Sequence, residues 1–86
     1  MEYSSAVSNR LRRVEGQIRG VLGMMEGGKS CDQVVVQLSA IRSAVDKAIA
    51  SIVVENLEHC VREDIASNSD SRATVKQAMD LLLKSR

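Results

Sequence analysis

The feature that most constrains the fold is a stretch of 34 residues, Cys31 to Asp64, that contains neither glycine nor proline. Its apolar residues recur at spacings of three and four, which is the period of a helix, and the stretch is far too long for one strand. The stripe consists of Val34, Leu38, Ile41, Val45, Ala48 and Ile52. The sequence therefore predicts one long helix over about residues 31–64.

A second helical pattern precedes this stretch, over about residues 5–26. Its apolar seam runs without a break through Val7, Leu11, Val14, Ile18, Val21 and Met25. Gly27 and Gly28 are expected to end this helix, since glycine readily adopts the left-handed conformation of a helix C-terminus. Ser30 followed by Gln33 fits a capping box at the start of the long helix.

The C-terminal part of the chain predicts a third, shorter helix. Residues 66–71 (ASNSDS) are polar and indicate a linker, and a helix is expected over about residues 71–85. The fold class is therefore all-α, with three helices per chain in a single domain spanning residues 1–86.

The apolar stripe of the long helix runs over about nine turns, and such a stripe favours aggregation when it is exposed. We expect two chains to bury it as an antiparallel four-helix-bundle dimer.

The chain has two cysteines, Cys31 and Cys60, both within the long helix. They are 29 residues apart, so they share one helix face and lie about 44 Å apart along the axis. A disulfide requires Cα atoms within about 7 Å, which excludes a bond between them inside one continuous helix. Antiparallel packing of two chains would instead place Cys31 of each chain beside Cys60 of the other.

The two cysteines are expected to differ in chemistry. Cys31 lies at the first helical position, where the positive end of the helix dipole favours the nucleophilic thiolate. Cys60 lies near the opposite end and has no such help. One reactive and one resolving thiol form the arrangement of a redox switch. The alternative is that both cysteines are small buried hydrophobic residues.

A metal site is the other chemistry that two thiols allow. Cu(I) favours soft thiolates, often with an imidazole. The position one helical turn before Cys60 holds Asn56, whose amide is a poor Cu(I) ligand. The only histidine, His59, points about 100° away from Cys60 and is expected to pair with Glu55 or Glu63 instead. We therefore expect no metal ligands and no cofactor.

Composition excludes several classes of protein. No stretch reaches the roughly 20 apolar residues of a membrane span, and the N-terminus lacks the features of a signal peptide. The expected compartment is therefore the cytoplasm, where lasting structural disulfides are rare. No acid–base pair, phosphate-binding loop or open metal site is evident, so an enzyme is not expected.

The net charge of +1 does not by itself indicate a nucleic-acid partner, but its distribution is uneven. Between residues 9 and 20, four arginines stand against a single glutamate. On composition alone, such a run is more often the solvated side of an amphipathic helix than a binding surface. Lys47 lies well away from the cysteine face and could extend a basic surface. Arg42 lies on the cysteine face, where a pair with Asp46 is the alternative to DNA contact.

Three blocks of sequence resemble the CsoR/RcnR/FrmR family of small all-helical bacterial repressors. They are the first-helix segment NRLRRVEGQIRG at residues 9–20, Cys31 followed by QLSAIRSA at residues 37–44, and ENLEHCV at residues 55–61. The resemblance covers nearly the whole chain. It implies a disc-shaped tetramer, a dimer of dimers, that binds double-stranded operator DNA and releases it on sensing an inducer.

The resemblance also implies roles for single residues. The family's metal sensors carry histidine where this chain has Asn56, and Cys-Asn-Cys is similar to the persulfide-sensing branch, called CstR. That branch implies sensing of sulfane sulfur through di-, tri- or tetrasulfide links between Cys31 and Cys60 of opposing subunits. Matching positions imply DNA contacts at Arg10 and Lys47 first, and then at Arg13, Gln17 and Arg19.

Two other functions stay open. One is a Cu(I)-responsive repressor of the same family that uses the two thiolates alone. The other is a helical redox or sulfur-carrier module that binds no DNA.

Overall fold

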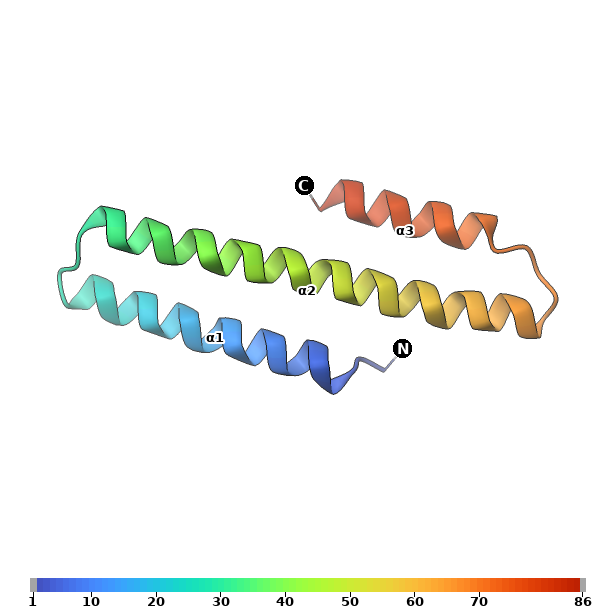
Figure 1. Cartoon of the computed structure of the whole chain (residues 1–86), viewed down its shortest axis with the longest axis horizontal. Coiled ribbons are helices and arrows are strands. Elements are labelled where there is room, and N and C mark those ends of the chain that lie inside the picture. Colours follow the sequence, from blue (N-terminus) through green and yellow to red (C-terminus); the bar gives the residue numbers. More distant parts are fainter. Residues whose placement is uncertain (1, 86) are drawn as a thin grey trace. The chain divides into compact units, whose positions relative to one another are not determined.

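The computed structural model describes residues 2–85, which form three helices and no strand (Figure 1). Helix α1 spans Ser5–Glu26, α2 spans Cys31–Ala66 and α3 spans Arg72–Lys84. This arrangement confirms the prediction of an all-α chain with three helices. Helix α2 continues two residues further than expected, and α3 is one residue shorter at each end.

The chain divides into two compact units that share helix α2. One unit comprises residues 4–48, which are α1 and the first part of α2. The other contains residues 49–85, which are the rest of α2 and α3, together with residues 2 and 3. Each cysteine therefore belongs to a different unit.

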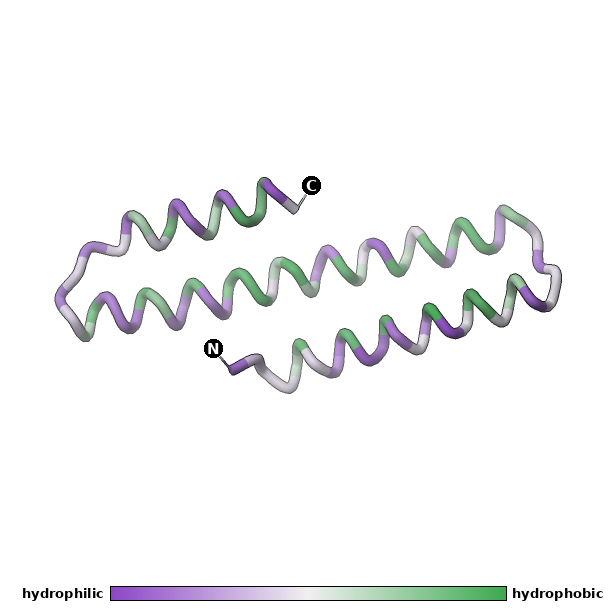
Figure 2. The backbone as a smooth tube through the Cα atoms, turned by 180° about the vertical axis from the view of Figure 1, so that it is seen from behind, coloured by the Kyte–Doolittle hydropathy of each residue, from purple (hydrophilic) through white to green (hydrophobic). Residues whose placement is uncertain are grey.

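In the unit of residues 4–48, α1 runs antiparallel to the first part of α2 (Figure 1). Val14 and Val21 of α1 form a buried cluster with Ile41 of α2. The partly buried residues around this cluster are Val34, Ala44 and Val45. Figure 2 shows the apolar positions of α1 mainly along its edge toward α2 and the hydrophilic positions along the outer edge.

Only half of the apolar seam expected on α1 is buried within the chain. Val7, Val14 and Val21 are at most 6% exposed, whereas Leu11 is 43% exposed and Ile18 is 45% exposed. Residues seven apart lie almost on one line along a helix, and this line is what a single neighbouring helix can cover. The other half of the seam projects from the unit.

Both ends of α1 are fixed by local hydrogen bonds. The Ser4 hydroxyl oxygen accepts a hydrogen bond from the Val7 N–H at 3.2 Å, which caps the N-terminus. At the other end, Gly28 has a φ of 71°. The Gly28 N–H donates to Met25 at 3.2 Å and the Lys29 N–H donates to Met24 at 2.9 Å, which is the pattern of a Schellman motif.

The C-terminus of α2 has the same motif, with asparagine in place of glycine. Asn68 has a φ of 58°, and its N–H donates to the Ile65 carbonyl at 3.1 Å. The Ser69 N–H donates to the Asp64 carbonyl at 2.7 Å. Asparagine tolerates the left-handed conformation better than most residues. The motif therefore ends α2 at Ala66, which is the first residue of the segment predicted to be a linker.

In the unit that contains residues 49–85, α3 runs antiparallel to the second part of α2 (Figure 1). This unit has few buried hydrophobic residues. They are Val53 on α2 and Ala78 on α3, each 7% exposed. Large apolar side chains of α3 are exposed instead, namely Val75, Met79, Leu81 and Leu83.

We expect Gly28→Ala to lower the free energy of unfolding by about 1 kcal/mol, because an L-residue in the left-handed conformation costs roughly that amount. Gly16→Ala is the matched control, since a Cβ there would meet no atom within 4 Å. It should raise the stability by about 0.5 kcal/mol through helix propensity. Urea unfolding followed by circular dichroism, at one protein concentration, measures both. Equal effects of the two substitutions would contradict the role of Gly28.

Candidate thiol site and basic surface

Cys31 is held at the first position of α2 by the capping box that the sequence predicts. The Ser30 hydroxyl oxygen accepts a hydrogen bond from the Gln33 N–H at 3.3 Å. In return, Gln33 Oε1 accepts from the Ser30 N–H at 3.3 Å and from the Ser30 hydroxyl at 3.2 Å. The Cys31 side chain itself is exposed and free. Within the single chain, this thiol is therefore open to solvent.

Cys60 has a different environment, in the second part of α2. Its side chain is half-buried and free. The Cys60 thiol donates a hydrogen bond to Asn56 Oδ1, with the sulfur and oxygen 3.9 Å apart. Asn56 thus lies beside this sulfur, one helical turn before it, as the spacing indicates. Cys60 is the more sheltered of the two thiols.

The described residues of one chain do not form a metal centre. Among residues 2–85, no group of three or more His, Cys, Asp or Glu side chains could hold a metal ion. His59 Nε2 lies 3.1 Å from Glu63 Oε1, which confirms one of the two ion pairs expected for this histidine. A metal bound at the cysteines would therefore need ligands from more than one chain.

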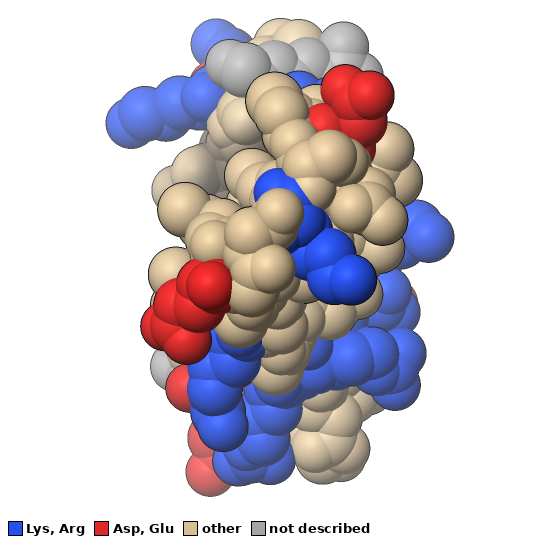
Figure 3. Space-filling view, turned by 90° about the vertical axis from the view of Figure 1, so that its left-hand side faces the viewer, with Lys and Arg blue, Asp and Glu red and all other residues tan. Residues whose placement is uncertain are grey.

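The arginines of α1 differ in whether they have partners. Arg19 pairs with Glu15 at 3.0 Å, and Arg12 donates to Asn9 Oδ1 at 3.2 Å. Arg10 and Arg13 form no hydrogen bond or ion pair with any residue in the described range 2–85. Figure 3 shows Lys and Arg side chains gathered over the lower side of that view, where α1 lies.

Two basic residues of α2 are also without partners within residues 2–85. Lys47 is exposed and forms no ion pair. Arg42 is exposed as well, and within residues 2–85 it forms no ion pair with Asp46, so the single chain does not make the pair considered as the alternative to DNA contact. Both cations are therefore available to an external partner.

Gln17 differs from the arginines named with it as a DNA contact. It is half-buried, and its Oε1 atom is enclosed without a hydrogen-bond partner among the described residues. A buried acceptor of this kind normally finds a donor. The described residues of the single chain supply no donor. Gln17 is therefore less accessible to DNA than Arg13 and Arg19, which are exposed.

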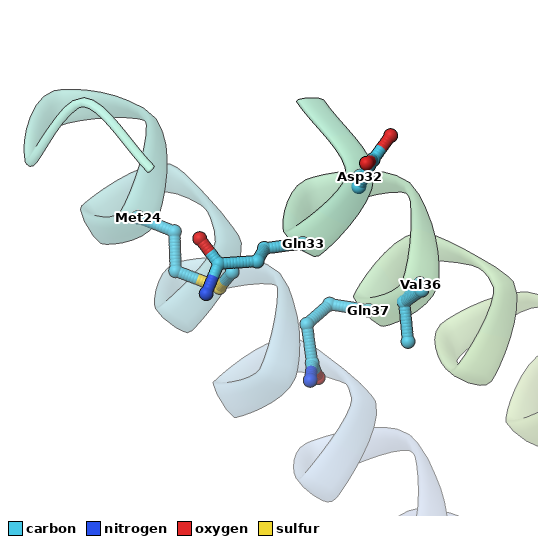
Figure 4. A pocket seen from close by; sticks show the side chains of 5 residues that line it. All are labelled: Met24, Asp32, Gln33, Val36 and Gln37. Carbon is cyan, nitrogen blue, oxygen red and sulfur yellow. The ribbon is translucent and has the colours of Figure 1, made fainter. Parts of the chain in front are cut away.

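A shallow hollow of about 300 Å³ lies where α1 ends and α2 begins (Figure 4). It is lined by Met24, Asp32, Gln33, Val36 and Gln37. In Figure 4 the Met24 side chain extends toward the Gln33 amide, while the Asp32 carboxylate points away from α1. The hollow is open and has no converging polar groups, so it does not form an enclosed ligand site.

Comparison with known proteins identifies the family. A family model described as metal-sensitive transcriptional repressor matches residues 3–84. The chain belongs to this family. Its members are transcriptional repressors and not enzymes, and the family implies binding to operator DNA. The chain is therefore a metal- or thiol-sensing repressor of the CsoR family.

Several relatives are similar over most of the chain. An uncharacterized protein of Bacillus subtilis, YrkD, is 56% identical over 63 residues, which cover 73% of this chain and 100% of YrkD. The copper-sensing transcriptional repressor CsoR of the same organism is 32% identical over 91% of this chain and 76% of its own length.

Solved structures agree with the fold. The nickel-responsive transcriptional regulator InrS has a TM-score of 0.78 at 31% identity, covering 94% of this chain and 93% of its own. The Cu(I)-bound repressor CsoR of Geobacillus thermodenitrificans has a TM-score of 0.76 at 28% identity, covering 98% and 91%. No helix within residues 2–85 of this repressor is long and apolar enough to cross a membrane.

We expect Arg10→Ala to weaken operator binding and to reduce the slope of log affinity against log salt by about 1 for each subunit whose Arg10 contacts a phosphate, because each of those contacts is lost. Arg62→Ala is the control, since Arg62 is already paired with Glu58 at 3.6 Å. Fluorescence anisotropy across a salt series measures both slopes. An unchanged slope for Arg10→Ala would remove Arg10 from the contacts.

Proposed function

We propose that this protein is a repressor that binds operator DNA in the cytoplasm and releases it when sulfane sulfur links Cys31 to Cys60 of a partner subunit. The single observation that carries the proposal is the pair of free thiols on α2, one exposed and one sheltered beside Asn56. The whole chain, residues 1–86, acts as one repressor domain. Sulfane sulfur donors are the inducers.

The unburied apolar surface supports a site built from two chains. Among the described residues, seven hydrophobic side chains are buried, and none of the large ones is fully buried. The exposed large hydrophobic residues of α1 and α2 include Leu11, Ile18, Leu22, Met25, Val35, Val36 and Leu38. Burying them in an antiparallel four-helix bundle would bring Cys31 of each chain to Cys60 of the other. Two such dimers would form the disc-shaped tetramer.

The chemistry requires only the two thiols and a polysulfide. The Cys31 thiolate attacks a sulfane sulfur of the donor, a new S–S bond forms, and the shortened polysulfide leaves with the electron pair of the broken bond. The thiolate of Cys60 on the partner then attacks the sulfur next to the end of the chain on Cys31. Hydrosulfide leaves with that electron pair. One, two or three added sulfurs on Cys31 thus give a di-, tri- or tetrasulfide.

DNA binding is assigned to the basic face of α1 and to Lys47. Arg10, Arg13 and Lys47 have no competing partner among the described residues, which leaves their charges available to phosphates. Arg19 is also exposed and would exchange its bond with Glu15 for DNA. Gln17 is the weakest of the assigned contacts because its amide oxygen is enclosed.

Release of DNA requires that the linked state prefers a different arrangement of subunits from the DNA-bound state. A link at each end of the paired α2 helices would restrain both helices. We infer that this restraint shifts α1 and disrupts the spacing of basic surfaces across the tetramer.

A Cu(I)-responsive repressor is the second candidate, and the comparisons favour it. The named relatives include copper-sensing repressors, and one solved relative contains Cu(I). Against copper, the residue beside the Cys60 sulfur is Asn56, which offers an amide where a third soft or imidazole ligand would be needed. Copper would then have to be held by the two thiolates alone.

We expect Cys31→Ala to bind operator normally and to stay bound when polysulfide is added, whereas the wild type is released. Gel-shift titration of the reduced proteins measures both properties, and Ser67→Ala, which removes a hydroxyl bonded to the Glu63 carbonyl, serves as a control that keeps both thiols. Release of Cys31→Ala by polysulfide would contradict the proposed function.

The same gel-shift assay separates the two inducers. We expect one equivalent of Cu(I) per thiol pair to leave the wild-type protein on the operator, because Asn56 offers no third soft or imidazole ligand beside the Cys60 sulfur. Release at stoichiometric Cu(I), reversed by a chelator and with no response to polysulfide, would establish the copper function instead.

A further inference from the structure

Helix α3 lies along the part of α2 that carries Cys60, with a hydrogen bond to α2 near its first turn and a hollow shared with α2 near its last turn. Near its N-terminus, the Thr74 hydroxyl donates a hydrogen bond to Asp64 Oδ2 at 2.8 Å. Near its C-terminus, Leu81 lines a hollow together with Ile49 and Val53 of α2. The α2 segment between residues 49 and 64 therefore runs beside α3.

Cys60 lies within this segment, on the same face of α2 as Val53 and Asp64. Val53, Cys60 and Asp64 are separated by seven and four residues, so they project from one face of the helix. Val53 is buried, and Asp64 is bonded to α3. Cys60 is half-buried, in contrast to the exposed Cys31. The shelter of Cys60 thus coincides with the position of α3.

We propose that α3 is a cover over Cys60 and that the hydrogen bond between Thr74 and Asp64 is its clasp. Ala78 is the one α3 residue among the buried hydrophobic residues of the described chain, whereas Val75, Met79 and Leu83 are exposed. Apolar packing therefore holds α3 only weakly. The clasp joins a hydroxyl donor to a carboxylate, a stronger bond than one between neutral groups.

Local opening of α3 would then set the rate at which reagents reach Cys60. This consequence deepens the proposed function: Cys31 meets the sulfur donor first, and Cys60 reacts when α3 moves aside. The clasp itself does not depend on sulfur chemistry or on DNA.

The test is the rate at which iodoacetamide alkylates each cysteine of the reduced protein, resolved by peptide mass spectrometry. Thr74→Val keeps the branched shape but removes the donor. We expect Cys60 of this variant to be alkylated roughly ten to one hundred and fifty times faster than Cys60 of the wild type, the range for losing one hydrogen bond to a charged group. The rate at Cys31 should not change.

Three further variants make the test specific. Thr74→Ser keeps a hydroxyl donor and should restore the wild-type rate at Cys60. Asp64→Ala removes the acceptor and should accelerate Cys60 in the same way as Thr74→Val. Ser67→Ala removes a hydroxyl from the same turn, one that bonds the Glu63 carbonyl at 2.9 Å and not α3, and should have no effect.

If Cys60 is alkylated at the wild-type rate in both Thr74→Val and Asp64→Ala, the proposed clasp is wrong. It is also wrong if the alkylation of Cys31 is accelerated as much as that of Cys60, because an equal acceleration indicates that the whole chain is destabilised. This experiment can fail independently of the test of the proposed function. If the clasp variants behave as expected but polysulfide never links the wild-type chains, the proposed function fails and the cover stands. If polysulfide links the chains but alkylation is unaffected, the cover fails alone.

Discussion

The constraint on which the rest of the structure depends is that one chain cannot bury the apolar surface of α2. This helix has 36 residues, while α1 has 22 and α3 has 13. Apolar side chains of α2 stay exposed in the single chain, since Val36 is 64% exposed and Ile65 is 71% exposed. Exposed apolar area of this extent marks a surface that associates. Both cysteines lie on this helix, so whatever covers α2 also determines what the two thiols can contact.

Much of the fold follows from local sequence. The capping box of Ser30 and Gln33, and the glycine pair after α1, act through hydrogen bonds between residues a few positions apart, so their positions can be predicted. Helix α2 ends two residues later than the sequence pattern predicts, because Asn68 adopts the left-handed conformation that glycine usually adopts after a helix. The bond between Thr74 and Asp64 could not be predicted, since it depends on how α3 folds back over ten residues of chain.

Some features of the candidate site can be predicted from helix geometry, and others depend on packing between helices. The spacing of Cys31 and Cys60 follows from helix geometry alone, and so does the placement of Asn56 beside the Cys60 sulfur. The difference in exposure between the two thiols, and the enclosed amide oxygen of Gln17, depend on packing between helices. Family membership establishes a repressor; the inducer rests on the chemistry of the residues around the two sulfurs.

In the proposed repressor, each sensing site contains Cys31 of one chain and Cys60 of another. The most direct test mixes two variants, Cys31→Ala and Cys60→Ala, lets their subunits exchange under reducing conditions, removes the reductant and adds polysulfide. Intact mass under non-reducing conditions should show one covalent species, with one copy of each variant and up to two added sulfurs, and neither variant alone should form it. Absence of the mixed species, while subunit exchange is demonstrated independently, would contradict the account.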